Sequence, residues 1–224
     1  MTSRRGEYLD ALGLRSYVPR VALPLGSPPP AVAADSQGLG WNDLEIAVRD
    51  CRRCALCGTR TQTVFGVGGR DARLMVVGEA PGAEEDRQGE PFVGRAGQLL
   101  NSVLRAAGFA REQVFIANIL KCRPPDNRDP LPAEVEQCLP YLERQIELVR
   151  PTLLLCVGRI AAQNLLRTDV TIGRLRGRVH TLPSGLPVVV TYHPAYLLRS
   201  PGEKRKVWED LKLAMGVLRD GHGA

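Results

Sequence analysis

The chain has 224 residues and a formal net charge of +6, a length that suits one globular domain and is short for two. Its 44% apolar and 24% charged residues favour a globular protein over a disordered or membrane one. Every apolar run is too short to cross a bilayer, and no apolar signal core follows the polar start, so we predict a cytoplasmic protein.

The charge and the cysteines give the first hints of function. Excess positive charge favours a polyanionic partner through counterion release, although many basic proteins bind no nucleic acid. The six cysteines occur without a secretion signal, and cytosolic thiols stay reduced. They therefore favour metal binding or catalysis over disulfides.

Residues 1–40 are predicted to form a flexible arm. They are rich in proline, alanine and glycine and lack sustained apolar periodicity, so they bury too little apolar surface to order on their own. From Trp41 onward apolar residues recur at helical spacing. The compact domain is therefore expected to span residues 41–224.

Four short apolar runs in the domain are typical of strands buried on both faces, namely residues 74–77, 114–117, 153–157 and 188–190. Helical patterns lie between and after them, at residues 97–107, 133–149, 159–166 and 203–218. This alternation predicts an α/β fold in which helices cover both faces of a four-stranded parallel sheet.

The first predicted strand runs directly into a glycine-rich turn at residues 78–82, with the sequence GEAPG. Ligands of open parallel sheets bind beyond the carboxyl ends of the strands. Glycine lets the backbone approach a ligand and turn its N–H groups toward it. A binding loop is one interpretation, and a plain tight turn is the other.

The second predicted strand ends at Asn118. A side-chain amide presents a donor and an acceptor side by side, which can match O4 and N3–H of uracil. Cytosine shows the reverse pattern, so discrimination requires neighbours that fix the orientation of the amide. The alternative is a cap or turn residue.

The fourth predicted strand ends just before His193, and Pro194 stops it. His193 is therefore expected on a loop at the same edge of the sheet as Asn118. A histidine there can donate a hydrogen bond to an oxygen that gains negative charge. The alternative is a loop histidine with one backbone hydrogen bond.

Four thiols are predicted to meet at one metal centre. A CxxC pair together with two distant cysteines suits tetrahedral zinc or a four-iron cluster, and the spacing does not separate the two. Cys57 offers a competing pair with the second thiol of that motif, while Cys156 lies in an apolar strand and suits a buried core position. The four predicted ligands are Cys51, Cys54, Cys122 and Cys138.

Taken together, four segments resemble the family 4 uracil-DNA glycosylases. They are GEAPG with Glu85 and Asp86 after it, PFVGRAG at 91–97, the segment 118–125 that ends in KCRPP, and HPAYLL at 193–198. Each is modest alone, whereas their order is specific. The resemblance covers about residues 44–218, which is the chain without its arm.

The resemblance implies a fold, an activity and a cofactor. The fold is a three-layer α/β/α sandwich with a central four-stranded parallel sheet. The activity is that of a monofunctional uracil-DNA glycosylase, which flips uracil out of single- or double-stranded DNA and hydrolyses its N-glycosidic bond to start base excision repair. The cofactor is a 4Fe-4S cluster on the four predicted cysteine ligands, with a structural role, and the protein is expected to be a monomer.

The resemblance also assigns roles in uracil binding. It implies that the turn containing Glu79, Ala80 and Pro81 contacts the edge of the base. Phe92 is implied to stack on the base, Asn118 to read it, and His193 to bind its O2.

One departure from the best-known uracil glycosylases concerns water. Those enzymes carry a water-positioning aspartate in the first turn, where this chain has Ala80. Glu79 and Glu85 are therefore the candidates for orienting water, and a dissociative mechanism needs little activation of it.

The segment after His193 is the predicted contact with DNA. Leu197 and Leu198 are candidates for a wedge that fills the gap left by the flipped base, and Arg199 for a phosphate contact. The alternative makes both leucines core residues at the start of a helix.

Two other functions are considered. A related branch becomes covalently linked to uracil-containing DNA through a histidine in a basic insertion, but residues 123–131 contain no histidine, and Ala80 stands where that branch usually has glutamine. A non-catalytic iron-sulfur module that binds DNA would account for the cysteines and the charge. It leaves Asn118 and His193 unexplained.

Overall fold

The computed structural model describes residues 36–220. Residues 1–35, most of the predicted arm, lie outside the described residues. The first described helix begins at Trp41, the residue at which the sequence predicts the compact domain to begin. None of the helices within residues 36–220 has the length and apolar character needed to cross a membrane.

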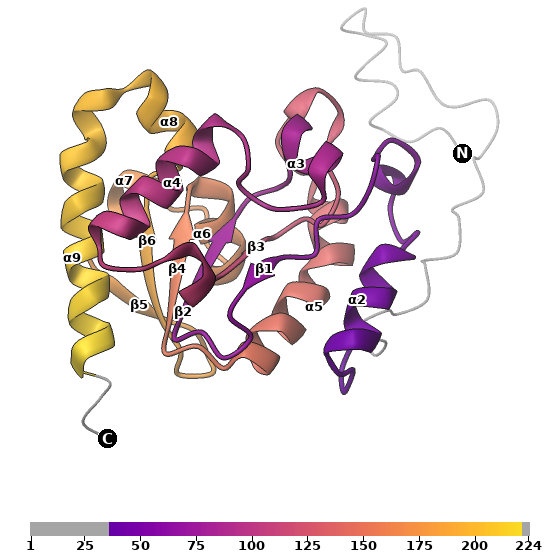
Figure 1. The fold of residues 1–224 in the computed structure, drawn as a ribbon, viewed down its shortest axis with the longest axis horizontal. Coiled ribbons are helices and arrows are strands. Elements are labelled where there is room, and N and C mark those ends of the chain that lie inside the picture. Colours follow the sequence, from indigo (N-terminus) through magenta and orange to yellow (C-terminus); the bar gives the residue numbers. More distant parts are fainter. Residues whose placement is uncertain (1–35, 221–224) are drawn as a thin grey trace, which may run out of the picture. The chain divides into compact units, whose positions relative to one another are not determined.

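Helices and strands alternate along the chain (Figure 1). The α-helices are α2 (Trp41–Arg49), α3 (Ala83–Gln88), α4 (Arg95–Ala106), α5 (Pro132–Val149), α6 (Arg159–Leu166), α7 (Ile172–Leu175), α8 (Pro194–Arg199) and α9 (Lys204–Asp220). The short 3-10 helices are η2 (Ala55–Gly58), η3 (Arg111–Gln113), η4 (Pro125–Asn127) and η5 (Pro201–Glu203). The strands are β1 (Val67–Gly68), β2 (Leu74–Gly78), β3 (Phe115–Asn118), β4 (Leu153–Val157), β5 (Val179–Thr181) and β6 (Pro187–Thr191).

The α/β prediction is confirmed, but the sheet has six strands where four were predicted. Its order is β1-β3-β2-β4-β6-β5. The four predicted strands form its parallel centre, and two short antiparallel strands, β1 and β5, add the edges. The edge strands lack the continuous apolar run of a buried strand, because β1 has two residues and two of the three residues of β5 are exposed.

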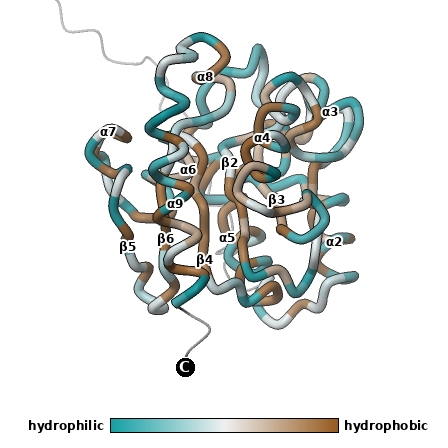
Figure 2. The backbone as a smooth tube through the Cα atoms, turned by 60° about the vertical axis from the view of Figure 1, so that its left-hand side comes forward, coloured by the Kyte–Doolittle hydropathy of each residue, from teal (hydrophilic) through white to brown (hydrophobic). Residues whose placement is uncertain are grey.

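Two hydrophobic cores flank the sheet, so the described residues form three layers. Side chains alternate along each strand: Met75 and Val77 pack with α2, α5 and α6 on one face, whereas Leu74 and Val76 pack with α4, α8 and α9 on the other. Because both faces are covered, the central strands are hydrophobic throughout, as the tube coloured by hydropathy shows for β4 and β6 (Figure 2).

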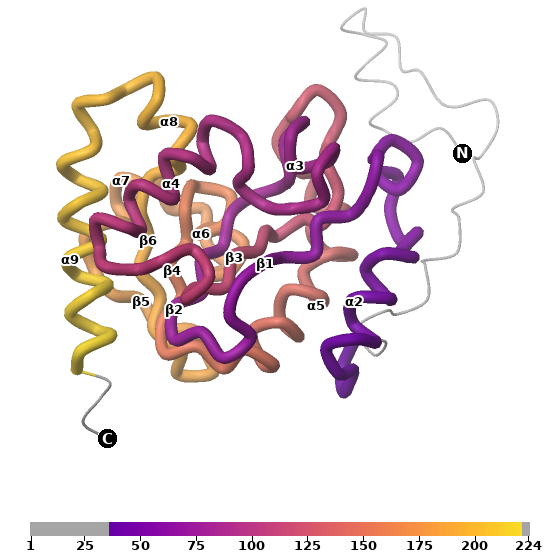
Figure 3. Tube along the Cα trace, viewed as in Figure 1, coloured from indigo at the N-terminus to yellow at the C-terminus, as the bar shows by residue number. Residues whose placement is uncertain are grey.

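The topology determines where a site can form. After β2 the chain forms β3 on one side of β2, and it then crosses over to form β4 on the other side of β2, as can be followed in Figure 3. Loops that leave neighbouring parallel strands in opposite directions open a crevice at the carboxyl ends. The turn after β2, the end of β3 and the loop after β6 therefore meet at one edge of the sheet.

Candidate active site

A pocket lies at this edge of the sheet. It brings together most of the residues that the sequence predicts for the site, and it adds residues that the sequence did not single out, Asn127 and Arg128 from the loop after β3 and Tyr196 from α8. The predicted residues in its wall are Glu79, Ala80, Pro81, Glu85, Phe92, Asn118, His193 and Arg199.

Asn118 is held at the floor of the pocket by the pairing of two strands. It lies opposite Gly78 in the parallel register of β2 and β3, and the residue after β3 continues the pairing through a bond from Ile119 N to Gly78 O of 3.0 Å. A Cβ on Gly78 would stand 2.4 Å from Asn118 Oδ1, so only glycine lets the amide lie there. Asn118 is 2% exposed.

The side-chain oxygen of Asn118 is a buried acceptor without a partner. Among residues 36–220, no donor reaches Oδ1 of this amide. Leaving a buried polar group unpaired costs about 1–3 kcal/mol, so such groups indicate a binding function when they face a pocket. The chain presents a hydrogen-bond acceptor where a ligand with an N–H group would satisfy it.

Phe92 forms a wall of the pocket from a strained loop. Its φ of 54° is left-handed, which is uncommon for a bulky residue. A Cβ on Gly97 would stand 1.8 Å from Phe92 O, so glycine in α4 allows the helix to pack against this loop. The phenyl ring is 5% exposed, and its centroid lies 5.6 Å from that of the His193 ring.

Glu85 holds the loops of the site together. Its Oε2 accepts a hydrogen bond from Gly82 N (3.2 Å), and its Oε1 accepts from Val93 N (3.0 Å) and Gly94 N (3.1 Å). Both oxygens are therefore engaged by backbone amides of the turn after β2 and of the loop that carries Phe92. This geometry favours a structural role for Glu85 over the predicted orientation of water.

His193 presents one defined tautomer to the pocket. Burial, with a smaller contribution from the positive charge of Arg199, lowers its pKa to about 4, so the ring is neutral near pH 7. Its Nδ1 accepts a hydrogen bond from Ala195 N at 3.1 Å, which places the ring proton on Nε2. The neutral ring therefore has its N–H donor on the nitrogen that α8 does not use.

Glu79 follows β2 directly and titrates near neutral pH. Burial and, to a smaller extent, the carboxylate of Asp129 raise its pKa to about 7, against the opposing effect of the Arg159 guanidinium. A carboxylate in a pocket with such a pKa is available as a base or as a fixed negative charge. The next residue, Ala80, has no hydroxyl and no carboxylate, so it can act neither as a base nor as a negative charge.

The three residues predicted to contact DNA differ in how far their side chains are exposed. Leu197 is 1% exposed and packs in the core with α9, so the wedge role predicted for it does not fit, and the alternative of a core leucine does. Helical spacing explains this, because α8 turns one side chain inward and the next outward. Leu198 is 41% exposed, and Arg199 lines the pocket.

The four predicted cysteine ligands line a second, smaller pocket. They come from the segment after α2, the loop after β3 and α5. Cys57 also lines this pocket, whereas Cys156 is buried in β4. Within the described residues, no three His, Cys, Asp or Glu side chains converge closely enough to surround a single metal ion.

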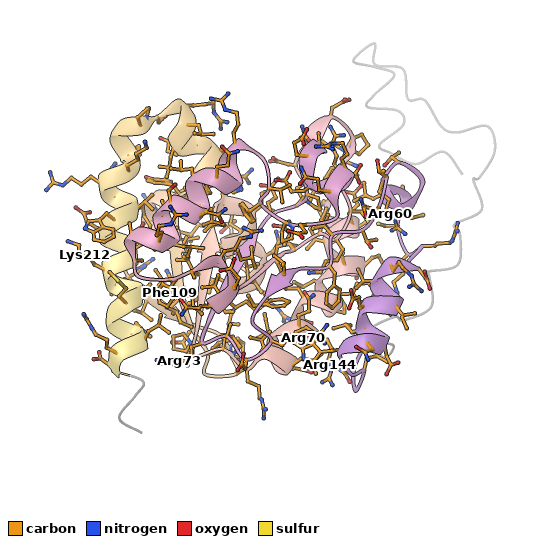
Figure 4. The ribbon with its side chains drawn as sticks, in the orientation of Figure 1. Arg60, Arg70, Arg73, Phe109, Arg144 and Lys212 are labelled. Carbon is orange, nitrogen blue, oxygen red and sulfur yellow. The ribbon has the colours of Figure 1, made fainter. Side chains whose placement is uncertain are left out.

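Hydrogen-bond donors point at the sulfur atoms of this cysteine pocket. Arg60, labelled in Figure 4, donates from Nη1 to Cys122 Sγ at 3.0 Å, and Lys121 N donates to Cys138 Sγ at 3.2 Å. Such donors stabilise thiolates that bind a metal centre. The donor set of four thiols from three distant segments therefore fits a thiolate-bound cluster.

Comparisons with known proteins agree with this geometry. The family model of the uracil DNA glycosylase superfamily matches residues 65–212. A type-4 uracil-DNA glycosylase of Archaeoglobus fulgidus is 46% identical over 178 residues, which cover 76% of this chain and 89% of that protein. A type-4 enzyme of Thermotoga maritima is 42% identical over 77% of this chain and 91% of its own length.

A more distant relative separates the branches of this superfamily. A type-5 uracil-DNA glycosylase of Pyrobaculum aerophilum is 33% identical over 58% of this chain and 64% of that protein, while a type-4 enzyme of the same organism is 42% identical over 77% of this chain and 92% of its own length. The chain therefore belongs to the uracil-DNA glycosylase superfamily and, within it, to the type-4 family.

Proposed function

We propose that this protein is a monofunctional uracil-DNA glycosylase that hydrolyses the bond between uracil and its deoxyribose and leaves the DNA backbone intact. The observation that carries the proposal is the buried, unpartnered Oδ1 of Asn118 in a pocket shared with His193 and Phe92. An acceptor fixed in this way requires an N–H group on its ligand, and N3–H of uracil supplies one.

Base recognition follows from the donors and acceptors in the pocket. Asn118 Oδ1 accepts from N3–H of uracil while its amide N–H donates to O4, and Nε2–H of His193 donates to O2. Cytosine has an acceptor at N3 and a donor at C4, so two of these contacts become repulsive. Phe92 stacks on the base once the nucleotide has left the helix, a step that costs a few kcal/mol.

The same contacts lower the barrier to bond cleavage. As the C1′–N1 bond breaks, the electron pair moves to the base and the sugar becomes cation-like, so negative charge grows on the uracil oxygens. Donors that strengthen with this charge stabilise the transition state. Water then adds to C1′, its proton is lost, and uracil leaves with a hydrogen on N1. We assign to the Glu79 carboxylate the role of orienting that water or of facing the cation.

We further propose that Cys51, Cys54, Cys122 and Cys138 hold a 4Fe-4S cluster. When bound, the cluster would supply structural cross-linking rather than redox chemistry. Its ligands would join the segment after α2 to α5 and to the loop that follows Asn118. We also propose that the protein acts as a monomer on single- or double-stranded DNA.

The test is release of free uracil from a uracil-containing oligonucleotide by the purified, iron-loaded protein, with a thymine-containing oligonucleotide as the control. The Asn118→Ala variant is expected to lose roughly 100- to 1000-fold in kcat, the usual cost of a missing donor to a developing oxyanion. Abasic DNA with an unbroken backbone supports the proposal.

Two other results would contradict it. A covalent complex with the oligonucleotide would favour the DNA-linking branch. Binding without any release of uracil would favour a non-catalytic iron-sulfur module.

A further inference from the structure

A buried lysine lies between the uracil pocket and the cysteine pocket. Lys121 is 1% exposed, follows Asn118 by three residues and directly precedes Cys122. Burying an ammonium group is costly unless its protons are hydrogen-bonded. The roles assigned to the uracil-binding residues and to the cysteines do not account for this side chain.

The Lys121 ammonium is bonded to two neutral oxygens. Its Nζ donates to Asn118 O at 3.0 Å and to Gln145 Oε1 at 2.6 Å. Gln145 is fully buried, and its Nε2 donates to Phe65 O at 2.9 Å, which fixes the end of the amide that faces the lysine. The ammonium is thus held in one position, with one of its protons on the main chain of Asn118.

The backbone of Lys121 is fixed as well. Its N–H donates to Cys138 Sγ at 3.2 Å, and its carbonyl accepts from Val64 N at 2.8 Å. Cys138 and Gln145 are seven residues apart in α5, so they lie on the same face of the helix, two turns apart. Lys121 therefore connects the end of β3 to α5 at two levels, through its backbone and through its side chain.

We propose that Lys121 is a positioning residue for base recognition, supported by Gln145. Its ammonium fixes the main chain of Asn118 at the point where β3 ends, so that the amide meets uracil in a single orientation. Little movement is tolerated, because Oδ1 of Asn118 lies against the backbone of Gly78. The proposal rests on the proposed glycosylase function, in which Asn118 reads the base.

Three variants test the proposal: Lys121→Met, Gln145→Met and the double variant. Methionine keeps much of the length of either side chain and has no hydrogen-bond donor. Melting temperature and iron content report on folding and on the cysteine pocket. Uracil release reports on catalysis, and binding of free uracil reports on base recognition without turnover.

We expect Lys121→Met to slow the rate of uracil release by about 100-fold, which is the effect of a small misplacement in an active site. It should also weaken the binding of free uracil. Gln145→Met keeps the donor to Asn118 O and is expected to lose only a few-fold. Both single variants melt at lower temperature. The double variant should lose less stability than the two single losses combined, because it removes both members of a buried pair, yet stay as inactive as Lys121→Met.

If Lys121 had a purely structural role, the double variant would recover activity together with stability. That result would overturn the proposal. So would a folded Lys121→Met protein that releases uracil like the parent. If neither protein with Lys121→Met folds, Gln145→Met decides: a folded, iron-loaded protein that releases uracil a few-fold more slowly and binds free uracil more weakly than the parent supports the proposal, and parent-like release and binding overturn it.

The same assays separate this proposal from the proposed function. If the parent protein releases no uracil, the glycosylase function fails. Binding of free uracil by the parent and the variants then still decides whether Lys121 positions Asn118, since a variant that binds uracil as the parent does would contradict the positioning role.

Discussion

Two titratable side chains in the pocket at the edge of the sheet have pKa values that are shifted in opposite directions. Burial raises the pKa of Glu79 to about 7 and lowers the pKa of His193 to about 4. As the pH rises from about 6 to about 8, Glu79 therefore gains its negative charge, while His193 stays neutral and keeps its Nε2–H donor throughout.

We accordingly expect kcat/KM for uracil release to rise over about pH 6 to 8 and then to level off. Glu79→Gln should remove the rise and lower the plateau, because the amide carries no charge to face the sugar cation. A pH series with both proteins measures this. A parent profile that falls over the same range would show that the protonated form of Glu79 is the active one.

Gly78 is the second residue for which the structure predicts a specific effect of substitution. A Cβ there would stand 2.4 Å from Asn118 Oδ1 and 2.6 Å from Phe92 Cζ. Gly78→Ala should therefore displace both base contacts, cost about 1–3 kcal/mol of stability through overpacking, and reduce uracil release by about 100-fold. Urea unfolding and kcat/KM measure the two effects.

The control for this variant is Gly173→Ala in α7, because a Cβ at Gly173 has no atom within 4 Å. It should leave uracil release unchanged and keep or slightly raise stability, since alanine favours a helix. Equal activity in the two variants would mean that the space above Gly78 is not used for reading the base.

At the residue level, sequence reasoning could find side chains whose place follows from the end of a strand. Asn118 and His193 each follow a buried apolar run, so parallel topology brings them to one edge. It could not assign Glu85 or Lys121, because their partners are backbone groups and a glutamine from distant segments. Leu197 is buried because it packs against α9, a helix that follows it in the chain, and its local sequence does not reveal this contact.

Among the elements, the central strands could be predicted because both of their faces are buried. The predicted run 153–157 coincides with β4, and the other runs lie within one residue of β2, β3 and β6 at each end. Both edge strands were missed, since one face of an edge strand need not be apolar and β1 pairs with β3 over only two residues. Their pairing depends on neighbours that the local sequence does not reveal.

The cysteine pocket yields a prediction about how elements are joined. Cys54→Ser should lose bound iron and lower the melting temperature, because the segment after α2 would lose its link to α5. Cys57→Ser is the matched control: Cys57 lines the same pocket but is not a predicted ligand, so iron and stability should be retained. Iron and sulfide analysis together with thermal melting measures this.

The outcomes for the cysteine variants are distinct. Loss of iron in Cys57→Ser but not in Cys54→Ser would move the ligand set to Cys57. Zinc in place of iron in the parent protein would contradict the cluster itself.

For the whole molecule, the charge of +6 bears on how DNA is held. We expect affinity for uracil-containing DNA to fall with salt, and Arg199→Ala to reduce the slope of log K against log salt by about one, since Arg199 lines the pocket and is proposed to contact a phosphate. Titrations at several salt concentrations measure the slope.

The control is Lys212→Ala in α9, which carries the same charge outside the pocket wall. It should leave the slope unchanged. An equal reduction by both variants would mean that Arg199 acts through overall charge rather than through a phosphate contact.

The packing of α2 has a consequence for how the protein is made. Tyr141 in α5 donates its hydroxyl to Ala47 O in α2 at 3.3 Å, and Val48 and Tyr141 line one pocket. In the chain, β2, α3, α4 and β3 lie between these helices. During synthesis α2 leaves the ribosome before α5, so its contact with α5 can form only after both helices have been made. The contact between α2 and α5 therefore forms late relative to the synthesis of α2, and all four cysteines can capture iron only after Cys138 in α5 has been made.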